Sequence, residues 1–132
     1  MRFWIPLLML FGVTFSVHAQ EQPQPTAVIS AQIDAFKAND LDRAFSYASP
    51  TIKRLFGSAE RFGRMVKQSY PMVWRPERVR FGVFTDRSGQ PVQTVFFTDK
   101  AGSVFEASYH MLATESGWQI NGVFVRQAGV GA

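Results

Sequence analysis

The chain has 132 residues, which is enough for one domain and too few for two. Hydrophobic residues make up 46% and charged residues 18%, a globular composition that excludes a disordered chain. The absence of cysteine excludes a disulfide scaffold, a thiolate nucleophile and a cysteine zinc site, and the formal net charge is only +4.

The first 19 residues have the pattern of a secretory signal peptide. Arg2 supplies a basic start, an apolar run covers residues 3–15, and Val17-His18-Ala19 carries small residues at the two positions that signal peptidase reads. Cleavage after Ala19 gives a periplasmic or secreted protein that begins at Gln20. The alternative is a retained membrane anchor, although the run is shorter than the about 20 apolar residues that a spanning helix needs.

Helical patterns follow a flexible tether over residues 20–26. The spacing of Ile29, Ile33 and Phe36 predicts a first helix over residues 27–38, where the single domain, expected over residues 27–127, begins.

Short polar residues mark the starts of three more helices. Asp40 can cap a second helix, Ser49-Pro50 begins a third that Gly57 ends, and Ser58 caps a fourth that reaches about Ser69. Gly63 inside the fourth helix costs about 1 kcal/mol of helix propensity, which suggests close packing at that position. The apolar arc of this helix is Phe62, Met65, Val66, Ser69 and Tyr70.

The hydrophobic period changes from helical to two at residue 77. A connector over residues 72–75 precedes four predicted strands joined by short turns, so that neighbouring strands are antiparallel. The strands are expected over residues 79–83, 92–98, 103–114 and 118–126, before a tail over residues 128–132. The sequence therefore predicts an α+β fold, with N-terminal helices packed on one face of a curved four-stranded antiparallel sheet.

The register of the last hairpin follows from its turn. A two-residue loop at Ser116-Gly117 pairs Glu115 with Trp118 and Tyr109 with Phe124. One face then carries the apolar residues Phe105, Ala107, Tyr109, Met111, Ala113, Trp118, Ile120 and Phe124. The other face carries Glu106, Ser108, His110, Gln119 and Asn121.

Several short stretches resemble a known family. They are Ile33-Asp34-Ala35-Phe36, Ala44-Phe45-Ser46-Tyr47-Ala48-Ser49-Pro50, Met65-Val66 with Tyr70, Arg75-Pro76, and Gly117-Trp118-Gln119-Ile120-Asn121-Gly122-Val123. Over about residues 29–125 they are similar to the bacterial domain-of-unknown-function family numbered 4864. The resemblance implies export and a nuclear-transport-factor-2-like (cystatin-like) cone, and it implies no specific activity.

An apolar cavity between helices and sheet is the expected binding site, with the phenol of Tyr109 at its floor. A plain packed core is the alternative. The expected lining residues are Phe36, Tyr47, Phe105, Tyr109, Met111, Trp118 and Ile120. We predict a small-molecule or partner-binding domain without catalytic residues, cofactor or metal, since His110 is the only histidine beyond the signal. The alternatives are an isomerase- or hydrolase-type enzyme using Tyr109 or Asp34, and a dimeric interaction module.

Basic residues concentrate in one part of the chain. Residues 53–80 contain eight Lys or Arg and two Glu. Such a segment attracts an anionic partner or a membrane surface, or it is simply a solvated helix face. The residues expected to carry the interaction are Arg61, Arg64, Lys67, Arg75 and Arg78. A homodimer through the sheet is a further expected partner mode, and nucleic acid is not expected because no recognition motif is present.

Overall fold

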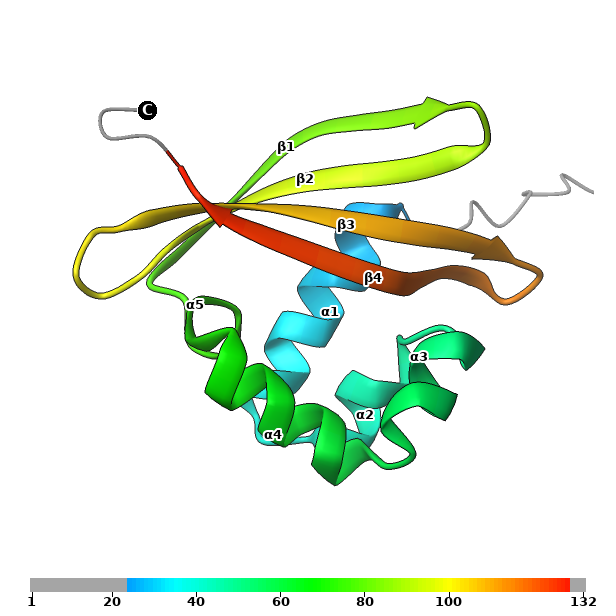
Figure 1. Cartoon of the computed structure of the whole chain (residues 1–132), viewed down its shortest axis with the longest axis horizontal. Helices are drawn as coiled ribbons and strands as arrows, with labels where there is room; N and C mark the ends of the chain where they lie inside the picture. The colour runs from blue at the N-terminus through cyan, green and yellow to red at the C-terminus, as the bar shows by residue number, and fades with distance from the viewer. Residues whose placement is uncertain (1–23, 129–132) are drawn as a thin grey trace, which may run out of the picture.

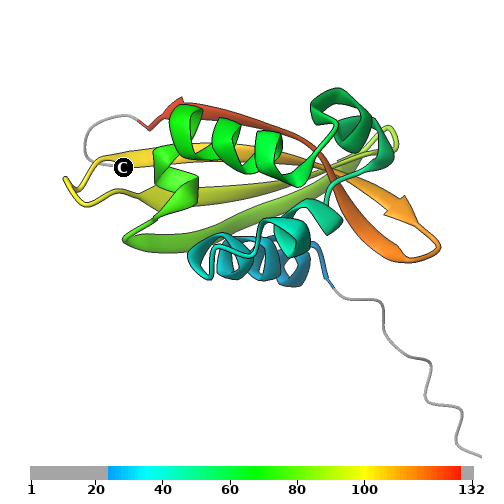
Figure 2. The ribbon, with the colours of Figure 1, turned by 90° about the horizontal axis from the view of Figure 1, so that it is seen from below.

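The computed structural model describes residues 24–128, in which five helices precede four strands. The helices are α1 (Pro25–Lys37), α2 (Leu41–Ser46), α3 (Pro50–Phe56), α4 (Ala59–Ser69) and α5 (Pro71–Trp74). The strands are β1 (Arg78–Arg87), β2 (Gln90–Thr98), β3 (Val104–Thr114) and β4 (Gly117–Gln127). They form one antiparallel sheet in the order β1-β2-β3-β4, and the helices lie on one face of it (Figure 1). Figure 2 shows the helices in front of the sheet when the molecule is seen from the helical side. The predicted α+β fold is confirmed. The signal sequence and residues 20–23 lie outside the described residues.

Side-chain caps place the starts of three helices where the sequence predicts them. The side chains of Asp40, Ser49 and Ser58 each accept a hydrogen bond from a backbone N–H in the first turn of the helix that follows. Gly57 ends α3 with φ of 78°, a conformation that glycine adopts without a Cβ clash. Helix α1 begins at Pro25, two residues earlier than expected. Proline is favourable at the first helical position, because an N–H there would have no partner within the helix.

The segment expected as a plain connector contains the helical turn α5. Arg75, directly after it, donates from Nη1 to the carbonyl oxygens of Phe36 (2.8 Å) and Trp74 (2.7 Å) and from Nη2 to Oδ1 of Asn39 (2.9 Å). Its guanidinium also lies 4.6 Å from the centre of the Trp74 ring. Arg75 therefore fastens α5 to the C-terminal end of α1, where helix carbonyl groups favour a cation.

Gly63 on α4 packs against Leu41 at the start of α2. A Cβ atom at this position would lie 2.5 Å from Cδ2 of Leu41 and 2.8 Å from its Cδ1. The close packing that a mid-helix glycine suggested is present at this position.

The predicted register of the last hairpin is wrong. The two loop residues are Glu115 and Ser116, because Thr114 pairs with Gly117 and Ala113 pairs with Trp118. Gly117 has φ of 107°, which places the left-handed residue of this hairpin at the first position of β4.

A β-bulge at Asn121 then changes which residues of β4 face the helices. Met111 pairs with Ile120, but His110 pairs with Gly122 and Tyr109 pairs with Val123. As a result, Val123 and Val125 pack against the core. Phe124, expected on the apolar face, lies instead on the outer face, where it is 66% exposed and its ring contacts that of His110 (centroids 5.1 Å apart).

The core lies between the inner face of the sheet and the helices. Its largest fully buried side chains are Tyr109, Phe36, Phe97 and Ile29. The sheet curls enough that the rings of Phe84 on β1 and Trp118 on β4, from opposite edges, lie with centroids 5.9 Å apart. This curl opens a space between the sheet and the helices.

Candidate functional site: an apolar cavity under the sheet

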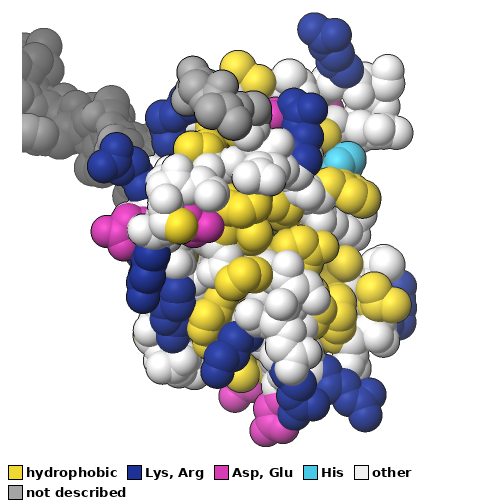
Figure 3. Space-filling view, turned by 60° about the vertical axis from the view of Figure 1, so that its left-hand side comes forward, with side chains coloured by type: hydrophobic (Ala, Val, Ile, Leu, Met, Phe, Trp, Pro, Cys, Tyr) yellow, Lys and Arg dark blue, Asp and Glu magenta, His cyan; other side chains and the backbone are white. Residues whose placement is uncertain are grey.

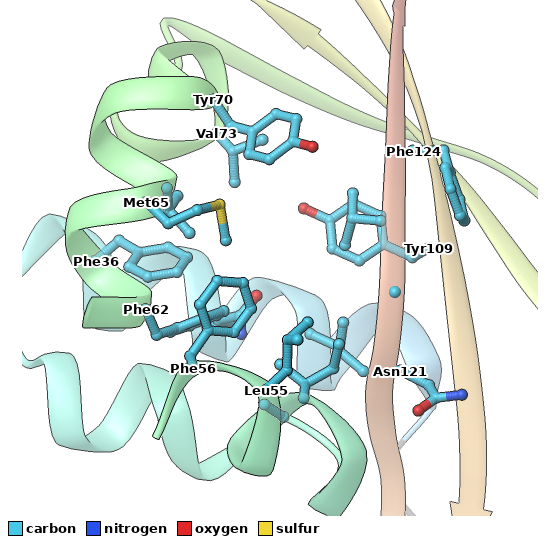
Figure 4. Close-up of a pocket in the computed structure, with 17 residues that line it drawn as sticks. Phe36, Leu55, Phe56, Phe62, Met65, Tyr70, Val73, Tyr109, Asn121 and Phe124 are labelled. Atoms are coloured by element: carbon cyan, nitrogen blue, oxygen red, sulfur yellow. The ribbon is translucent and has the colours of Figure 1, made fainter. Parts of the chain in front are cut away.

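A cavity of about 340 Å³ lies between the helices and the β3–β4 half of the sheet. Figure 4 shows side chains entering it from the helices on one side and from the sheet on the other. The lining residues are Gln32, Phe36, Ala48, Ile52, Leu55, Phe56, Phe62, Met65, Val66, Tyr70, Val73, Tyr109, Ile120, Asn121, Gly122, Val123 and Phe124. The volume is within the range of sites that hold small organic molecules.

The structure brings together three of the seven expected lining residues, which are Phe36, Tyr109 and Ile120. The other four lie elsewhere. Met111 is 4% exposed in the packed core, and Phe105 is half-buried against it. Trp118 packs on Phe84 at the curled end of the sheet.

Tyr47 is the fourth residue outside the cavity lining. Its hydroxyl accepts a hydrogen bond from Nε of Arg43 (3.3 Å), and its carbonyl accepts one from the N–H of Ile120 (2.8 Å). This tyrosine therefore joins the segment after α2 to the edge of β4.

Tyr109 is the polar group that the cavity leaves without a partner. Its side chain is fully buried, and its hydroxyl has no hydrogen-bond partner among the described residues. Burial raises the pKa of this phenol, with desolvation as the only cause, so Tyr109 is protonated at neutral pH. A buried hydroxyl without a partner costs stability, and most buried polar groups in proteins are paired.

The amide side chains of the lining are already engaged. Gln32 donates from Nε2 to the carbonyl of Ala44 (3.1 Å), and Oδ1 of Asn121 accepts from the hydroxyl of Ser49 (2.7 Å). Tyr70 differs, because its hydroxyl points into the cavity from the helical side (Figure 4). The lining hydroxyls without a hydrogen bond among the described residues are therefore those of Tyr70 and Tyr109.

The cavity opens between α3 and the edge strand β4. Leu55 on α3 is 72% exposed and Phe124 on β4 is 66% exposed, and both belong to the lining. Part of the β4 edge is closed by Ala48, which forms a parallel bridge to Ile120. Leu55 therefore gives the α3 side of the opening an apolar rim, whereas the ring of Phe124 lies on the far side of β4 (Figure 4).

Most of the helical lining was recognised in the sequence as an apolar helix face but not as a cavity wall. Phe62, Met65 and Val66 fall on the predicted apolar arc of α4, and Tyr70 ends it. Whether these residues pack against other side chains or line a cavity depends on the distance between the helices and the sheet. The periodicity of the sequence does not determine that distance. Val123 was missed because of the bulge, for which Gly122 inside a strand was the available signal.

Asp34, one of the two residues considered as an acid or base, lies away from the cavity. Asp34 is exposed on α1 and is not among the lining residues. The lining within residues 24–128 contains no Asp, Glu, His, Lys or Arg. Its titratable groups are Tyr70 and Tyr109.

The basic residues predicted to meet an anionic partner fall into two groups. Arg61, Arg64 and Lys67 are exposed on α4, and Arg78 is exposed at the start of β1. Arg75 instead makes the hydrogen bonds to α1 described above. Figure 3 shows Lys and Arg side chains around a band of exposed hydrophobic side chains. An interaction with an anionic partner or membrane surface stays a prediction.

The outer face of the sheet carries both polar and apolar side chains. Nε of Arg126 donates to Oε2 of Glu106 (3.0 Å), and Leu112 is 39% exposed on the same face of β3. The homodimer through the sheet also stays a prediction. Among residues 24–128, no three His, Asp or Glu side chains lie close enough to hold a metal ion, and no helix is long and apolar enough to cross a membrane.

The fold and cavity define a class of α+β protein in which helices and a curled antiparallel sheet enclose an apolar site. The sequence matches the family described as Domain of unknown function (DUF4864) over residues 18–130, and the chain belongs to this family. No curated protein matches the chain, and no solved structure matches it.

Proposed function

We propose that this protein binds one small, largely apolar molecule in the cavity beneath β3 and β4, without catalysing a reaction. The observation that carries the proposal is the buried hydroxyl of Tyr109, which faces an apolar space and has no partner. A ligand that meets this hydroxyl would remove the cost of leaving it unpaired. The raised pKa of Tyr109 argues against its use as a general base, because a phenol that stays protonated does not accept a proton.

The proposal includes the location and the wider fold family. We propose export to the periplasm or medium after cleavage at about Ala19, on the basis of the N-terminal sequence pattern. The arrangement of helices over a curled antiparallel sheet supports a nuclear-transport-factor-2-like cone. The mass of the mature protein tests the export, since cleavage at this position leaves a chain that begins at Gln20.

Methyl NMR with butylbenzene as the probe tests the binding. About 0.5 kcal/mol for each of its about 10 carbon atoms gives a dissociation constant on the order of 0.2 mM. Methyl groups of Ile52, Val66 and Val73 line the cavity and are expected to shift on titration. Those of Val79 and Val95 are outside the lining and serve as the internal control.

A cavity-filling variant provides the matched control. The side chain of Met65 points into the cavity (Figure 4), so Met65→Trp fills part of the space and is expected to weaken butylbenzene binding at least tenfold. Leu112→Trp adds the same indole on the outer face of the sheet and is expected to leave binding unchanged. Equal shifts at lining and control methyl groups, or unchanged binding to Met65→Trp, would overturn the proposal.

A further inference from the structure

The two unpaired phenols give the cavity one polar end. Figure 4 shows the hydroxyls of Tyr70 and Tyr109 pointing into the cavity from opposite walls, Tyr70 from the end of α4 and Tyr109 from β3. No hydrogen bond joins them. A polar atom placed between them could accept a hydrogen bond from each.

The opposite part of the cavity is aromatic and apolar. The ring of Phe62 lies with its centroid 5.9 Å from that of Phe36 and 5.6 Å from that of Phe56. All three rings belong to the lining, and Ile52 and Leu55 continue the apolar wall toward the opening. The body of a ligand in this region would lie mostly against apolar side chains.

The absence of basic side chains from the lining argues against an anionic ligand. No Lys, Arg or His lines the cavity within the described part of the chain, so a carboxylate would be buried without a counter-ion. A neutral oxygen avoids this cost, and a phenol that remains protonated always has a proton to donate to it.

The size of the cavity limits the size of the ligand. An engineered apolar cavity of about 150 Å³ holds benzene. In proportion, about 340 Å³ holds on the order of a dozen non-hydrogen atoms.

We propose that the ligand is a small apolar molecule with a single neutral carbonyl-type oxygen, held between the hydroxyls of Tyr70 and Tyr109, with its hydrocarbon part against Phe36, Phe56 and Phe62. This inference rests on the proposed function and adds the chemical class of the ligand. The hydroxyl oxygen of Tyr109 is closed off from solvent, so a neighbouring wall side chain must rotate before the ligand reaches it. Met65 is a half-buried lining residue on the helical wall, and its unbranched, flexible side chain can make this movement.

Three probes of similar size separate the contributions. They are 4-phenylbutan-2-one, which has a ketone oxygen, butylbenzene, which has none, and 3-phenylpropanoate, which is anionic at neutral pH. Their affinities are measured by calorimetry or NMR on the wild-type chain and on Tyr109→Phe, Tyr70→Phe and Tyr47→Phe. Tyr47 is the matched control, because it lies outside the cavity lining.

The expected result is a selective loss of ketone binding. Tyr109→Phe and Tyr70→Phe each weaken binding of the ketone by roughly 3- to 10-fold, the worth of one neutral hydrogen bond, and leave butylbenzene unchanged or tighter. Tyr47→Phe changes neither affinity. On the wild-type chain, 3-phenylpropanoate binds at least tenfold more weakly than the ketone.

Two other results overturn the inference and are distinguishable from a failure of the proposed function. If butylbenzene binds but the Tyr109 and Tyr70 variants weaken ketone and hydrocarbon equally, the phenols do not hold the oxygen and only this inference is wrong. The same holds if the carboxylate binds as tightly as the ketone. If neither butylbenzene nor the ketone binds the wild-type chain, the proposed function is wrong as well.

Discussion

Replacing Tyr109 with phenylalanine should stabilise the ligand-free protein. The substitution removes one buried oxygen that has no hydrogen-bond partner and leaves the ring in place. An unsatisfied buried hydroxyl costs about 1–3 kcal/mol, and we take the lower end of this range. We therefore expect the free energy of unfolding to rise by about 1 kcal/mol, which corresponds to an increase in Tm of about 4–8 °C for a domain of this size.

Urea unfolding followed by tryptophan fluorescence measures this change. Tyr47→Phe is the matched control, since its hydroxyl makes one exposed hydrogen bond to Arg43 and its removal should change stability by less than about 0.5 kcal/mol. A destabilisation of 1 kcal/mol or more by Tyr109→Phe would refute the reasoning, because it would mean that the hydroxyl has a partner in the folded protein. The combination of higher stability and weaker ketone binding would show that the hydroxyl is retained for binding and not for folding.

Three further substitutions or conditions test separate parts of the account. Burial raises the pKa of Tyr109 above its ordinary value of 10.0, so above pH 10 the phenol ionises in the unfolded chain before it does in the folded protein, and the free energy of unfolding falls. Below pH 10 the phenol is protonated in both states and causes no such fall. Between about pH 9 and 11.5 the free energy of unfolding should therefore fall less steeply in Tyr109→Phe, by up to about 1.4 kcal/mol per pH unit, and equal slopes would contradict this. Gly63→Ala should lower the free energy of unfolding by about 1–3 kcal/mol despite the higher helix propensity of alanine, because the new methyl group meets Leu41; thermal unfolding that shows stabilisation would mean that Leu41 moves aside easily. Arg75→Lys should cost about 1–3 kcal/mol because lysine cannot reproduce the forked hydrogen bonds to α1, whereas Arg64→Lys on the exposed face of α4 should cost less than about 0.5 kcal/mol, and equal effects in chemical denaturation would contradict the structural role of Arg75.

Local signals in the sequence predicted the helical half of the fold well. Asp40, Ser49 and Ser58 cap helices as their positions suggested, because a cap depends on residues within one turn of each other. Gly63 correctly indicated close packing, because a glycine inside a helix is a local signal. The sequence did not show that its neighbour would be Leu41.

The last hairpin was harder to predict because its register depends on one extra residue in β4, Asn121. The bulge at Asn121 moves Val123 inward and Phe124 outward, and strict alternation along the strand gives the opposite assignment. The cavity was harder still. Tyr109 was expected at its floor, but the residues around it depend on how far the curled sheet stands from the helices, which no local pattern encodes.

Native mass spectrometry of the protein purified gently from its host tests the central claim most directly. The account predicts a species heavier than the bare chain by one small molecule, on the order of 200 Da for about a dozen non-hydrogen atoms, and its loss in Met65→Trp. If the wild-type protein and Met65→Trp each have only the mass of their own bare chain, the claim that the cavity is a binding site is contradicted.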